Sequence, residues 1–266
     1  MHPALNPVVE QWLRYLQQRN RSAGTVRSYR STMAHYLPDP LAATVDDVQA
    51  WWDSNDAAGP ATRARLLSCV RSFYRWALRQ DLLTADPTRR LDAPSLPSGA
   101  PRYITRHQLD ILLREFPGDL RRAVCLGAWA GLRVSEVAAL DWADIDIDRH
   151  RLNVRGGKGN KSRAVGMHAL LLDSLLPDTG GNVVTAGGTP YDGGGLQRRI
   201  NRAMKAAGVN ATFHQLRHRY GTITYGVTGD PLAVAAAMGH ASLNSTRIYA
   251  AVSDDALDRV ATAAVR

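Results

Sequence analysis

Residues 85–102, ADPTRRLDAPSLPSGAPR, separate two parts of the chain that differ in their sequence pattern. The stretch contains four prolines and no sustained apolar periodicity, which is typical of a linker between domains. A length of 266 residues also exceeds the usual size of a single hydrophobic core. We therefore expect two domains, residues 1–92 and 104–266, joined by an interdomain linker at residues 93–103.

The first hundred residues have the apolar spacing of short helices. Residues 6–19, NPVVEQWLRYLQQR, place Val9, Trp12, Leu13 and Leu16 on one face at helical spacing. Three further stretches have helical patterns, namely 26–37, 44–53 and 59–80. Ser22 is a suitable N-cap for the first of them and Thr44 for the second. Short connections between four helices predict a small helical bundle.

The second part combines helices with a short region of alternating residues. Residues 144–167, DIDIDRHRLNVRGGKGNKSRAVGM, alternate and carry a Gly-rich turn, which predicts an antiparallel hairpin or a three-stranded sheet. Residues 180–195, GGNVVTAGGTPYDGGG, have the composition of a flexible loop. Helices are expected around these segments, at 104–116, 119–140 with a break at Gly131, 195–209, 212–227 and 230–240. The expected class is mainly α with a small β-sheet.

The charge of the chain points to a polyanionic partner. The net charge is +9, and both parts are basic, with 12 Arg against 9 acidic residues in 1–100 and 21 Lys and Arg against 15 in the rest. Nucleic acid is the partner that such a balance favours. The two cysteines, Cys69 and Cys125, stand singly in apolar helical patterns and are expected to be buried thiols. The sequence contains no run of about 18 apolar residues, so no membrane span is predicted.

Two motifs place basic residues where the backbone turns. Arg133 follows the helix break at Gly131, from where a guanidinium can bind two phosphate oxygens; Glu136, one turn later, could orient Arg133 or favour the helix N-terminus. Lys158 stands between two glycines in the predicted hairpin turn, which allows close approach to a ligand. A helix-capping arginine and a solvated charged turn are the structural alternatives for these two motifs.

Two further motifs lie near the C-terminus. His214 and Arg217 are three apart on a predicted helix and so share a face. His218 lies four residues after His214, but the intervening residues lack the Glu of a zinc-binding motif, so no metal site is expected. His240 follows a predicted helix end, and Tyr249 lies nine residues further on. Taken alone, a tyrosine after such a Ser/Thr-rich stretch is most often a packed aromatic residue.

Together, the order and spacing of these motifs resemble those of the tyrosine recombinase (phage integrase and Xer-like) family. The matching segments are AGLRVSEV at 130–137, GGKGNKSR at 156–163, HQLRHRYGT at 214–222, MGH at 238–240 and STRIYA at 245–250. Residues 72–94 also resemble the end of that family's core-binding domain, so the resemblance covers nearly the whole chain. One mild departure is Met238, where the family usually has Leu before Gly-His.

The resemblance implies a SAM-like N-terminal core-binding domain, an α+β catalytic domain and a role for each motif. Family members cut a DNA strand by forming a 3′-phosphotyrosine and rejoin it without metal, ATP or another cofactor. The implied catalytic residues are the nucleophile Tyr249, the phosphate-binding Arg133 and Arg217, the acid/base His214, the leaving-group acid Lys158 and the phosphate-contacting His240, with Glu136 accessory.

The resemblance also implies partners. Double-stranded DNA carrying recombination sites is expected between the two domains, with backbone or groove contacts from Arg27, Arg30, Arg63 and Arg65, although a solvated helix face explains those four arginines nearly as well. Recombination needs a homotetramer on DNA, and the tail at 252–266 is expected to pack on a neighbouring subunit or, equally, in cis. Accessory DNA-bending proteins are possible partners, and a membrane is not.

Few residues precede the first predicted helix, so we expect a compact member without an arm-binding domain, acting in the cytoplasm of a bacterial host. Integration or excision of mobile DNA, including viral genomes, and replicon resolution are all consistent with the motifs. A type IB topoisomerase-like enzyme and a non-catalytic DNA-binding regulator are the alternatives.

Overall fold

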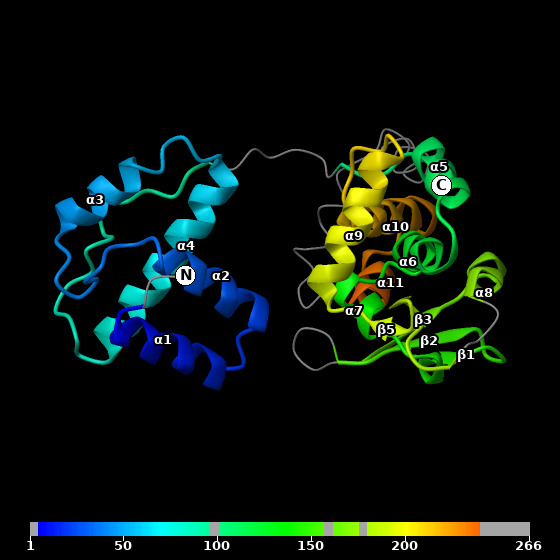
Figure 1. The fold of residues 1–266 in the computed structure, drawn as a ribbon, viewed down its shortest axis with the longest axis horizontal. Helices are drawn as coiled ribbons and strands as arrows, with labels where there is room; N and C mark the ends of the chain where they lie inside the picture. The colour runs from blue at the N-terminus through cyan, green and yellow to red at the C-terminus, as the bar shows by residue number, and fades with distance from the viewer. Residues whose placement is uncertain (1–4, 96–101, 157–161, 176–179, 240–266) are drawn as a thin grey trace, which may run out of the picture. The chain divides into compact units, whose positions relative to one another are not determined.

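The computed structural model describes residues 5–95, 102–156, 162–175 and 180–239. The chain divides into two compact units, residues 1–98 and 99–266, and each is described here by itself. The division falls within the predicted linker at 93–103, of which residues 96–101 lie outside the described part. Figure 1 shows the elements of each unit.

The first unit is helical in all its described elements, as the apolar spacing predicted. Its helices are α1 (Pro7–Gln18), α2 (Ala23–Met33), α3 (Val45–Asp53) and α4 (Pro60–Arg79). The side chains of Asn6, Ser22 and Thr44 each accept a hydrogen bond from a backbone N–H in the first turn of the helix that follows. These caps satisfy N–H groups that have no partner within the helix.

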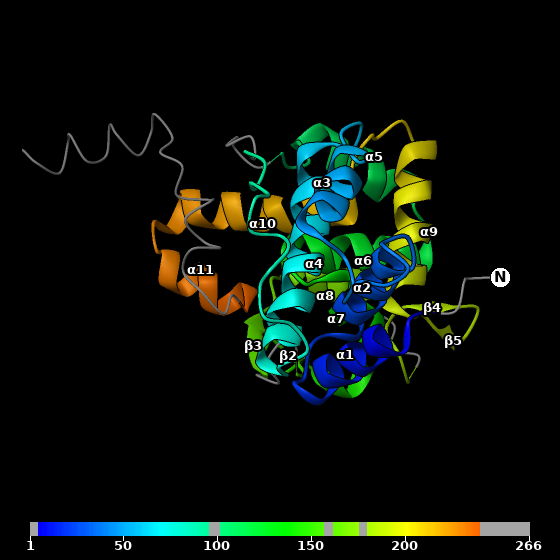
Figure 2. The same cartoon turned by 90° about the vertical axis from the view of Figure 1, so that its left-hand side faces the viewer.

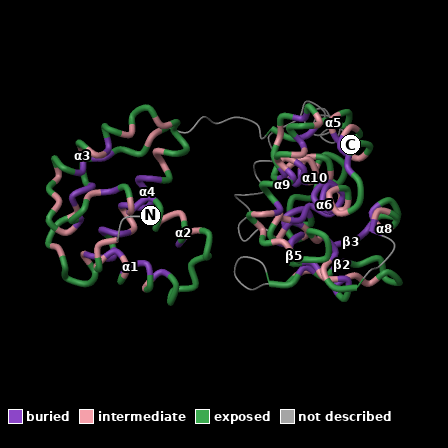
Figure 3. Tube along the Cα trace, in the orientation of Figure 1, coloured by how far each residue is buried: buried purple, intermediate pink, exposed green. Residues whose placement is uncertain are grey.

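Aromatic side chains dominate the core of the first unit. Trp12 on α1 and Phe73 on α4 meet edge to face with ring centroids 5.6 Å apart, and both are fully buried. The hydroxyl of Tyr74 donates to the carbonyl of Pro40 and bonds the hydroxyl of Tyr36, so these buried phenols have polar partners. Buried positions recur along the helices (Figure 3), and the four residues predicted on the apolar face of α1 are all buried.

The second unit has a helical core with small sheets at one edge. Its elements, in chain order, are α5 (Arg106–Glu115), α6 (Gly118–Trp129), α7 (Val134–Ala139), the 3-10 turn η1 (Trp142–Asp144), β1 (Ile145–Asp146), β2 (Arg151–Val154), β3 (Arg163–Gly166), α8 (Ala169–Leu175), β4 (Thr185–Ala186), β5 (Thr189–Pro190), α9 (Gly193–Ala206), α10 (Phe213–Thr228) and α11 (Pro231–Met238).

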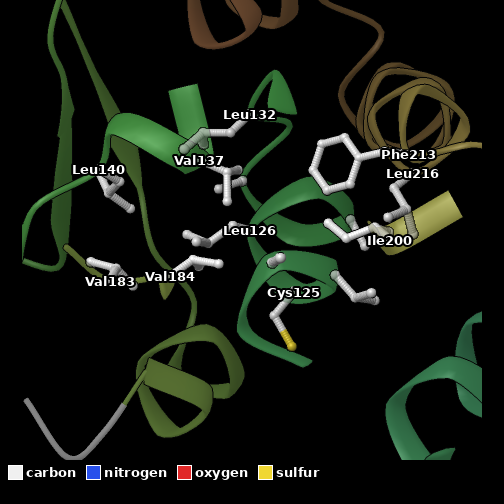
Figure 4. Close-up of a cluster of buried hydrophobic side chains, with 14 of the residues drawn as sticks. Cys125, Leu126, Leu132, Val137, Leu140, Val183, Val184, Ile200, Phe213 and Leu216 are labelled. Atoms are coloured by element: carbon white, nitrogen blue, oxygen red, sulfur yellow. The ribbon is translucent and has the colours of Figure 1, made fainter. Parts of the chain in front are cut away.

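Helix α6 forms the centre of this unit. Its residues 123–128 are all buried, and it packs against α5, α7, α8 and α10. Gly127 allows the close approach of α10, because a Cβ there would lie 2.8 Å from the ring of Phe213. Figure 4 shows Phe213 and Leu216 lying over α6, with Leu126 and Val137 on the same apolar cluster. Because residues 123–128 are buried on every side, this part of α6 fixes the positions of the elements around it.

The alternating segment forms a three-stranded antiparallel sheet in the order β1-β2-β3, as predicted. In the β2–β3 pair, Leu152 lies opposite Val165, and Val154 lies opposite Arg163. Leu152, Val154 and Val165 are buried, so one face of the sheet belongs to the core.

The glycine-rich stretch at 180–195 differs from the loop that its composition predicted. It contains the β4–β5 hairpin, and α9 already begins at Gly193. Val183 and Val184 are buried in the main core, and the N–H of Val183 donates to the carbonyl of Leu140. The stretch is ordered by packing and by a strand-like contact with a distant segment, neither of which is visible in its composition.

Helices α10 and α11 run side by side, and α11 also contacts β3 (Figure 2). Pro231 lies in the first turn of α11, and Gly239 ends it in a left-handed conformation with φ of +63°. The sequence predicted this helix at residues 230–240, and α11 lies within that range. The end of α11 therefore lies beside the sheet and beside α10, which carries the predicted site residues His214 and Arg217.

Candidate active site

Arg133 lies at a sharp turn between α6 and α7. Gly131 makes this turn with φ of +65°, and a Cβ at that position would lie 2.4 Å from the ring of Tyr220. Both the backbone conformation and the close ring require glycine there. Arg133 is the N-cap of α7, and about a third of its side chain (32 %) is exposed, so its guanidinium can be reached by a ligand.

Glu136 is the carboxylate on which the basic side chains of the site converge. It accepts hydrogen bonds from the backbone N–H and the guanidinium of Arg133, both at 2.8 Å, and two more from the guanidinium of Arg163, both at 2.9 Å. Its burial works to raise its pKa, but the hydrogen bonds and charges of Arg163 and Arg133 outweigh burial and lower the pKa of Glu136 to about 2. Glu136 is therefore ionised at neutral pH.

Arg217 reaches the same carboxylate from α10. Its side chain is buried, and its guanidinium donates to the carbonyls of Gly131 and Met238. One guanidinium nitrogen lies 3.9 Å from Glu136. A buried charge is tolerated only when it is paired and hydrogen-bonded, and these contacts meet that condition. Arg133 and Arg217, 84 positions apart in the sequence, thus meet at one acid.

His214 and His218 form a pair on the face of α10 next to Arg217. Their ring centroids are 4.3 Å apart and their planes nearly perpendicular. Desolvation is the main cause that lowers the pKa of both histidines. The positive charges of Arg217 and Arg133 lower the pKa of His214 further. For His218, desolvation together with the charges of His214 and Arg217 lowers the pKa to about 4. His214 is the more exposed of the two. The lowered pKa favours the neutral form of both rings, in which one ring nitrogen can accept a hydrogen bond.

Arg163 is a member of the site that our sequence analysis did not single out. It begins β3, its side chain is only 11 % exposed, and it binds both carboxylate oxygens of Glu136. A signal for it was available in the sequence. Strand residues two apart share a face, so Arg163 belongs with the apolar Val165 and Met167, both buried. A charged residue on a buried face requires a buried partner of opposite charge.

Three arginines bind the last carbonyls of α11, one each. Arg163 Nε donates to the carbonyl of Ala237 at 2.7 Å, Arg217 Nη2 to that of Met238 at 2.5 Å, and Arg133 Nη2 to that of Gly239 at 2.9 Å. The last carbonyls of a helix have no partner within it, and positive charge is favoured at this end. The end of α11 and the carboxylate of Glu136 therefore hold the three guanidiniums together.

The charge of this cluster suits an anion. Three guanidiniums and one ionised carboxylate leave a net charge of +2 within one partly buried site. Arginine binds phosphate oxygens in a bidentate manner, and low solvent exposure strengthens the attraction. The arrangement can bind a phosphodiester and stabilise additional negative charge on it.

Several predicted site residues lie outside the described residues. They are Lys158, His240, Tyr249 and the tail at 252–266. The strands on either side of the Lys158 turn are described, and Gly239, which precedes His240, is the last described residue of the chain. The structure thus brings together Arg133, Glu136, His214 and Arg217.

The four arginines predicted to contact DNA in the first unit have different surroundings. Arg30 forms a two-contact ion pair with Glu10, Arg63 pairs with Asp56 at 2.9 Å, and Arg65 donates to Ser28 and Thr32 at 3.1 and 2.9 Å. Arg27 lies exposed on α2. Three of the four therefore have partners within the unit.

A groove of 370 Å³ in the first unit is lined by other basic residues. Arg21, Arg71 and Arg75 line it together with Tyr29 and small residues of α4. Arg71 and Arg75 are four apart on that helix, so their spacing already placed them on one face in the sequence.

The described residues offer neither a cluster of metal ligands nor a helix that could span a membrane. No group of three or more His, Cys, Asp or Glu side chains in the described part of the chain is arranged to hold a metal ion. Among the helices that the structure describes, none has the length and apolar character needed to cross a membrane. Cys69 and Cys125 are free thiols and buried, as predicted.

The sequence matches two models of one family. Residues 102–256 match the phage integrase family, and residues 9–81 match the phage integrase N-terminal SAM-like domain. Tyrosine recombinase XerC of Xanthomonas campestris pv. campestris is 31 % identical over 96 % of this chain and 87 % of its own. Tyrosine recombinase XerC of Corynebacterium efficiens is 31 % identical over 89 % and 84 %, and tyrosine recombinase XerD of Yersinia pestis is 28 % identical over 95 % of both chains.

Solved structures share the fold. A lambda integrase tetramer bound to a Holliday junction has a TM-score of 0.75 at 20 % identity, covering 91 % of this chain and 76 % of that one. The XerA recombinase has a TM-score of 0.53 at 24 % identity, covering 96 % of both chains. The family matches span both units and include all five segments of the second unit on which the resemblance was based. The chain belongs to the phage integrase family and is a tyrosine site-specific recombinase.

Proposed function

We propose that this recombinase cleaves and rejoins DNA at specific sites through a 3′-phosphotyrosine formed on Tyr249. The observation that carries the proposal is the meeting of Arg133 and Arg217 at the buried Glu136, beside His214. Such a site binds the non-bridging oxygens of one phosphodiester. The relatives named above are recombinases, so the topoisomerase and the non-catalytic regulator gain no support from them.

The chemistry requires concentrated positive charge. A phenol has a pKa of about 10 in water and becomes a nucleophile near neutral pH only where cations favour its ionised form. Negative charge also accumulates on the phosphate oxygens in the transition state, where fixed guanidiniums stabilise it without reorganisation. Arg133 and Arg217 supply both effects in this proposal.

The remaining motif residues complete the reaction. Neutral His214 accepts the proton of the tyrosine, and Lys158 donates a proton to the 5′-oxygen that leaves. His240 donates a hydrogen bond to a phosphate oxygen. The freed 5′-hydroxyl of another strand then attacks the phosphotyrosine, so one phosphodiester is exchanged for another, and neither ATP nor a metal ion is needed.

The decisive experiment traps the covalent intermediate. The protein is incubated with nicked DNA carrying its recombination site, and adducts are separated on a denaturing gel. We expect an adduct with the unmodified chain and none with Tyr249→Phe. Tyr103→Phe is the matched control, because Tyr103 is exposed near the linker. An adduct formed by Tyr249→Phe would refute the nucleophile assignment, and no adduct from the unmodified chain on DNA that it binds would favour a binding protein.

Removal of divalent metal tests the proposed source of the positive charge. With a chelator present throughout, we expect the yield of adduct to stay the same, because the arginines and Lys158 supply the cationic groups. Loss of cleavage on chelation, restored by a divalent ion, would refute the metal-independent mechanism.

We propose that the groove lined by Arg21, Arg71 and Arg75 contributes to DNA binding by the first unit. Each phosphate contact that is removed should lower the salt dependence of binding by about one in the slope of log K against log salt. Arg75→Gln is expected to weaken binding in this way. Arg79→Gln, an exposed arginine at the end of the same helix, should leave binding unchanged. Equal effects of the two variants would show that the groove has no special role.

The assembly and setting follow from the same proposal. The active species is a homotetramer on two DNA sites, with the tail at 252–266 packed on a neighbouring subunit. Accessory DNA-bending proteins are expected where the site must be looped. We place the reaction in the cytoplasm of a bacterial cell, on nucleoid DNA, in the integration or excision of mobile or viral DNA or the resolution of replicons.

A further inference from the structure

The geometry points to Arg163 as a positioning residue for the recombination reaction: it fixes Glu136 and the end of α11, and thereby the guanidinium of Arg133. This inference rests on the proposed role of Arg133 in binding the phosphate. Arg163 itself is not proposed to touch the DNA.

The first observation is the way in which Arg163 divides its donors. Two nitrogens bind the two oxygens of Glu136 at 2.9 Å each, and Nε binds the carbonyl of Ala237 at 2.7 Å. One side chain thus connects β3, α7 and α11. An ammonium group is a point charge and cannot span the two carboxylate oxygens and the carbonyl in this planar arrangement.

The second observation is the dependence of Arg133 on the same two partners. Its guanidinium donates to the Oε1 atom of Glu136 and to the carbonyl of Gly239. Arg163 binds the same Oε1 atom of Glu136, and it also binds the carbonyl of Ala237, two residues before Gly239. If Arg163 is removed, one side of the buried carboxylate loses its donors, and Glu136 is free to turn toward the remaining guanidiniums. The phosphate-binding face of Arg133 then moves with it.

The third observation is the fit of Arg163 against the end of α11. A Cβ at Gly239 would lie 2.8 Å from Nη1 of Arg163, and the φ of +63° also favours glycine there. Val234 and Met238 of α11 are buried, and Tyr220 and Tyr225 of α10 pack against them. Apolar contacts therefore hold one side of α11 on α10, while Arg163 holds its last turn on the sheet.

The test separates positioning from binding and from folding. Arg163→Gln is assayed for DNA affinity and for the single-turnover rate of adduct formation at saturating nicked DNA, alongside Arg163→Lys. A misplacement of about 1 Å in a reacting group costs on the order of a hundredfold in rate. We expect the rate of Arg163→Gln to fall at least tenfold, with affinity within about twofold of the unmodified chain. The rate of Arg163→Lys should lie between that of Arg163→Gln and that of the unmodified chain. Arg151→Gln, an exposed arginine of the same sheet, is the control and should keep the full rate.

A rescue experiment provides a readout that a purely structural role would not change. Arg163→Ala leaves a space of the shape of a guanidinium beside Glu136, and guanidinium ion at a non-denaturing concentration should restore part of the rate; an equal concentration of sodium should not. The inference is overturned if Arg163→Gln keeps the full rate, if its loss is matched by loss of DNA affinity or of folded protein, or if guanidinium fails to restore activity. Absence of an adduct from the unmodified chain would instead refute the proposed function.

Discussion

Glu136 offers the sharpest test of how the cationic cluster is held together. Glu136→Gln keeps the shape of the side chain but leaves three guanidiniums around a neutral group. The pKa of Glu136 falls from an ordinary 4.5 to about 2, and at 1.36 kcal/mol per pH unit this difference corresponds to about 3 kcal/mol in favour of the ionised, folded form. Removing one partner from a buried pair usually costs about 3–5 kcal/mol. We therefore expect Glu136→Gln to lower the stability of the second unit by about 3 kcal/mol at pH 7.

The pH dependence of this difference follows from the direction of the shift. Because the pKa is lower in the folded state, the unfolded state takes up the proton first as the pH falls. The contribution of Glu136 is therefore complete above pH 4.5 and is lost progressively as the pH falls from 4.5 to about 2. The two proteins should thus become more alike in stability over that range.

Native-state hydrogen exchange measures this effect in the unit concerned. Peptides from α6 and α10 report the opening of the second unit without interference from the first. Asp110→Asn is the control, because Asp110 and Arg106 form an exposed pair on α5; such pairs contribute about 1 kcal/mol or less. A Glu136→Gln variant within about 0.5 kcal/mol of the unmodified chain at pH 7, or a difference that does not change between pH 4.5 and 2, would refute the reasoning.

Two further changes test the turn before Arg133 and the histidine pair. Gly131→Ala should destabilise the second unit by more than about 1 kcal/mol in urea unfolding, because it combines a positive φ with a clash against Tyr220. Gly208→Ala is the control, since Gly208 shares the positive φ but faces open space, and it should lower the stability less. An equal loss of stability in the two variants would contradict the role of the Tyr220 ring. The folded-state pKa of His218, about 4, lies below its ordinary 6.5, so stability should fall as the pH drops from 6.5 to 4. His218→Gln should reduce this slope of melting temperature against pH, whereas an unchanged slope would assign it to other groups such as His214.

The elements predicted correctly are those whose signals are local. Ser22 and Thr44 cap the helices that follow them, because each signal depends on a side chain and a backbone N–H only a few residues apart. The convergence of Arg133 and Arg217 was expected from the order of the motifs, not from any local rule. The family resemblance supplied that part.

The features that were missed depend on contacts between distant segments. The stretch at 180–195 has a loop composition, yet Val183 and Val184 are ordered by the core and by Leu140. Arg163 is explained by Glu136, which lies 27 residues earlier on another element. The alternation of the strand places Arg163 on a buried face, but only the tertiary arrangement identifies Glu136 as its partner.

The contacts at the end of α11 also determine when the site can form. The three arginine-to-carbonyl bonds close separations of 106, 74 and 21 residues, and all of them end within residues 237–239. Closing such long loops has an entropic cost that is recovered only when the contacts are complete. During synthesis, the guanidiniums are therefore made well before the carbonyls that fix them. A nascent or truncated chain that stops before residue 237 lacks the three carbonyls that fix the guanidiniums, and so the ability to hold a phosphodiester in this geometry arises only after residue 239 has been made.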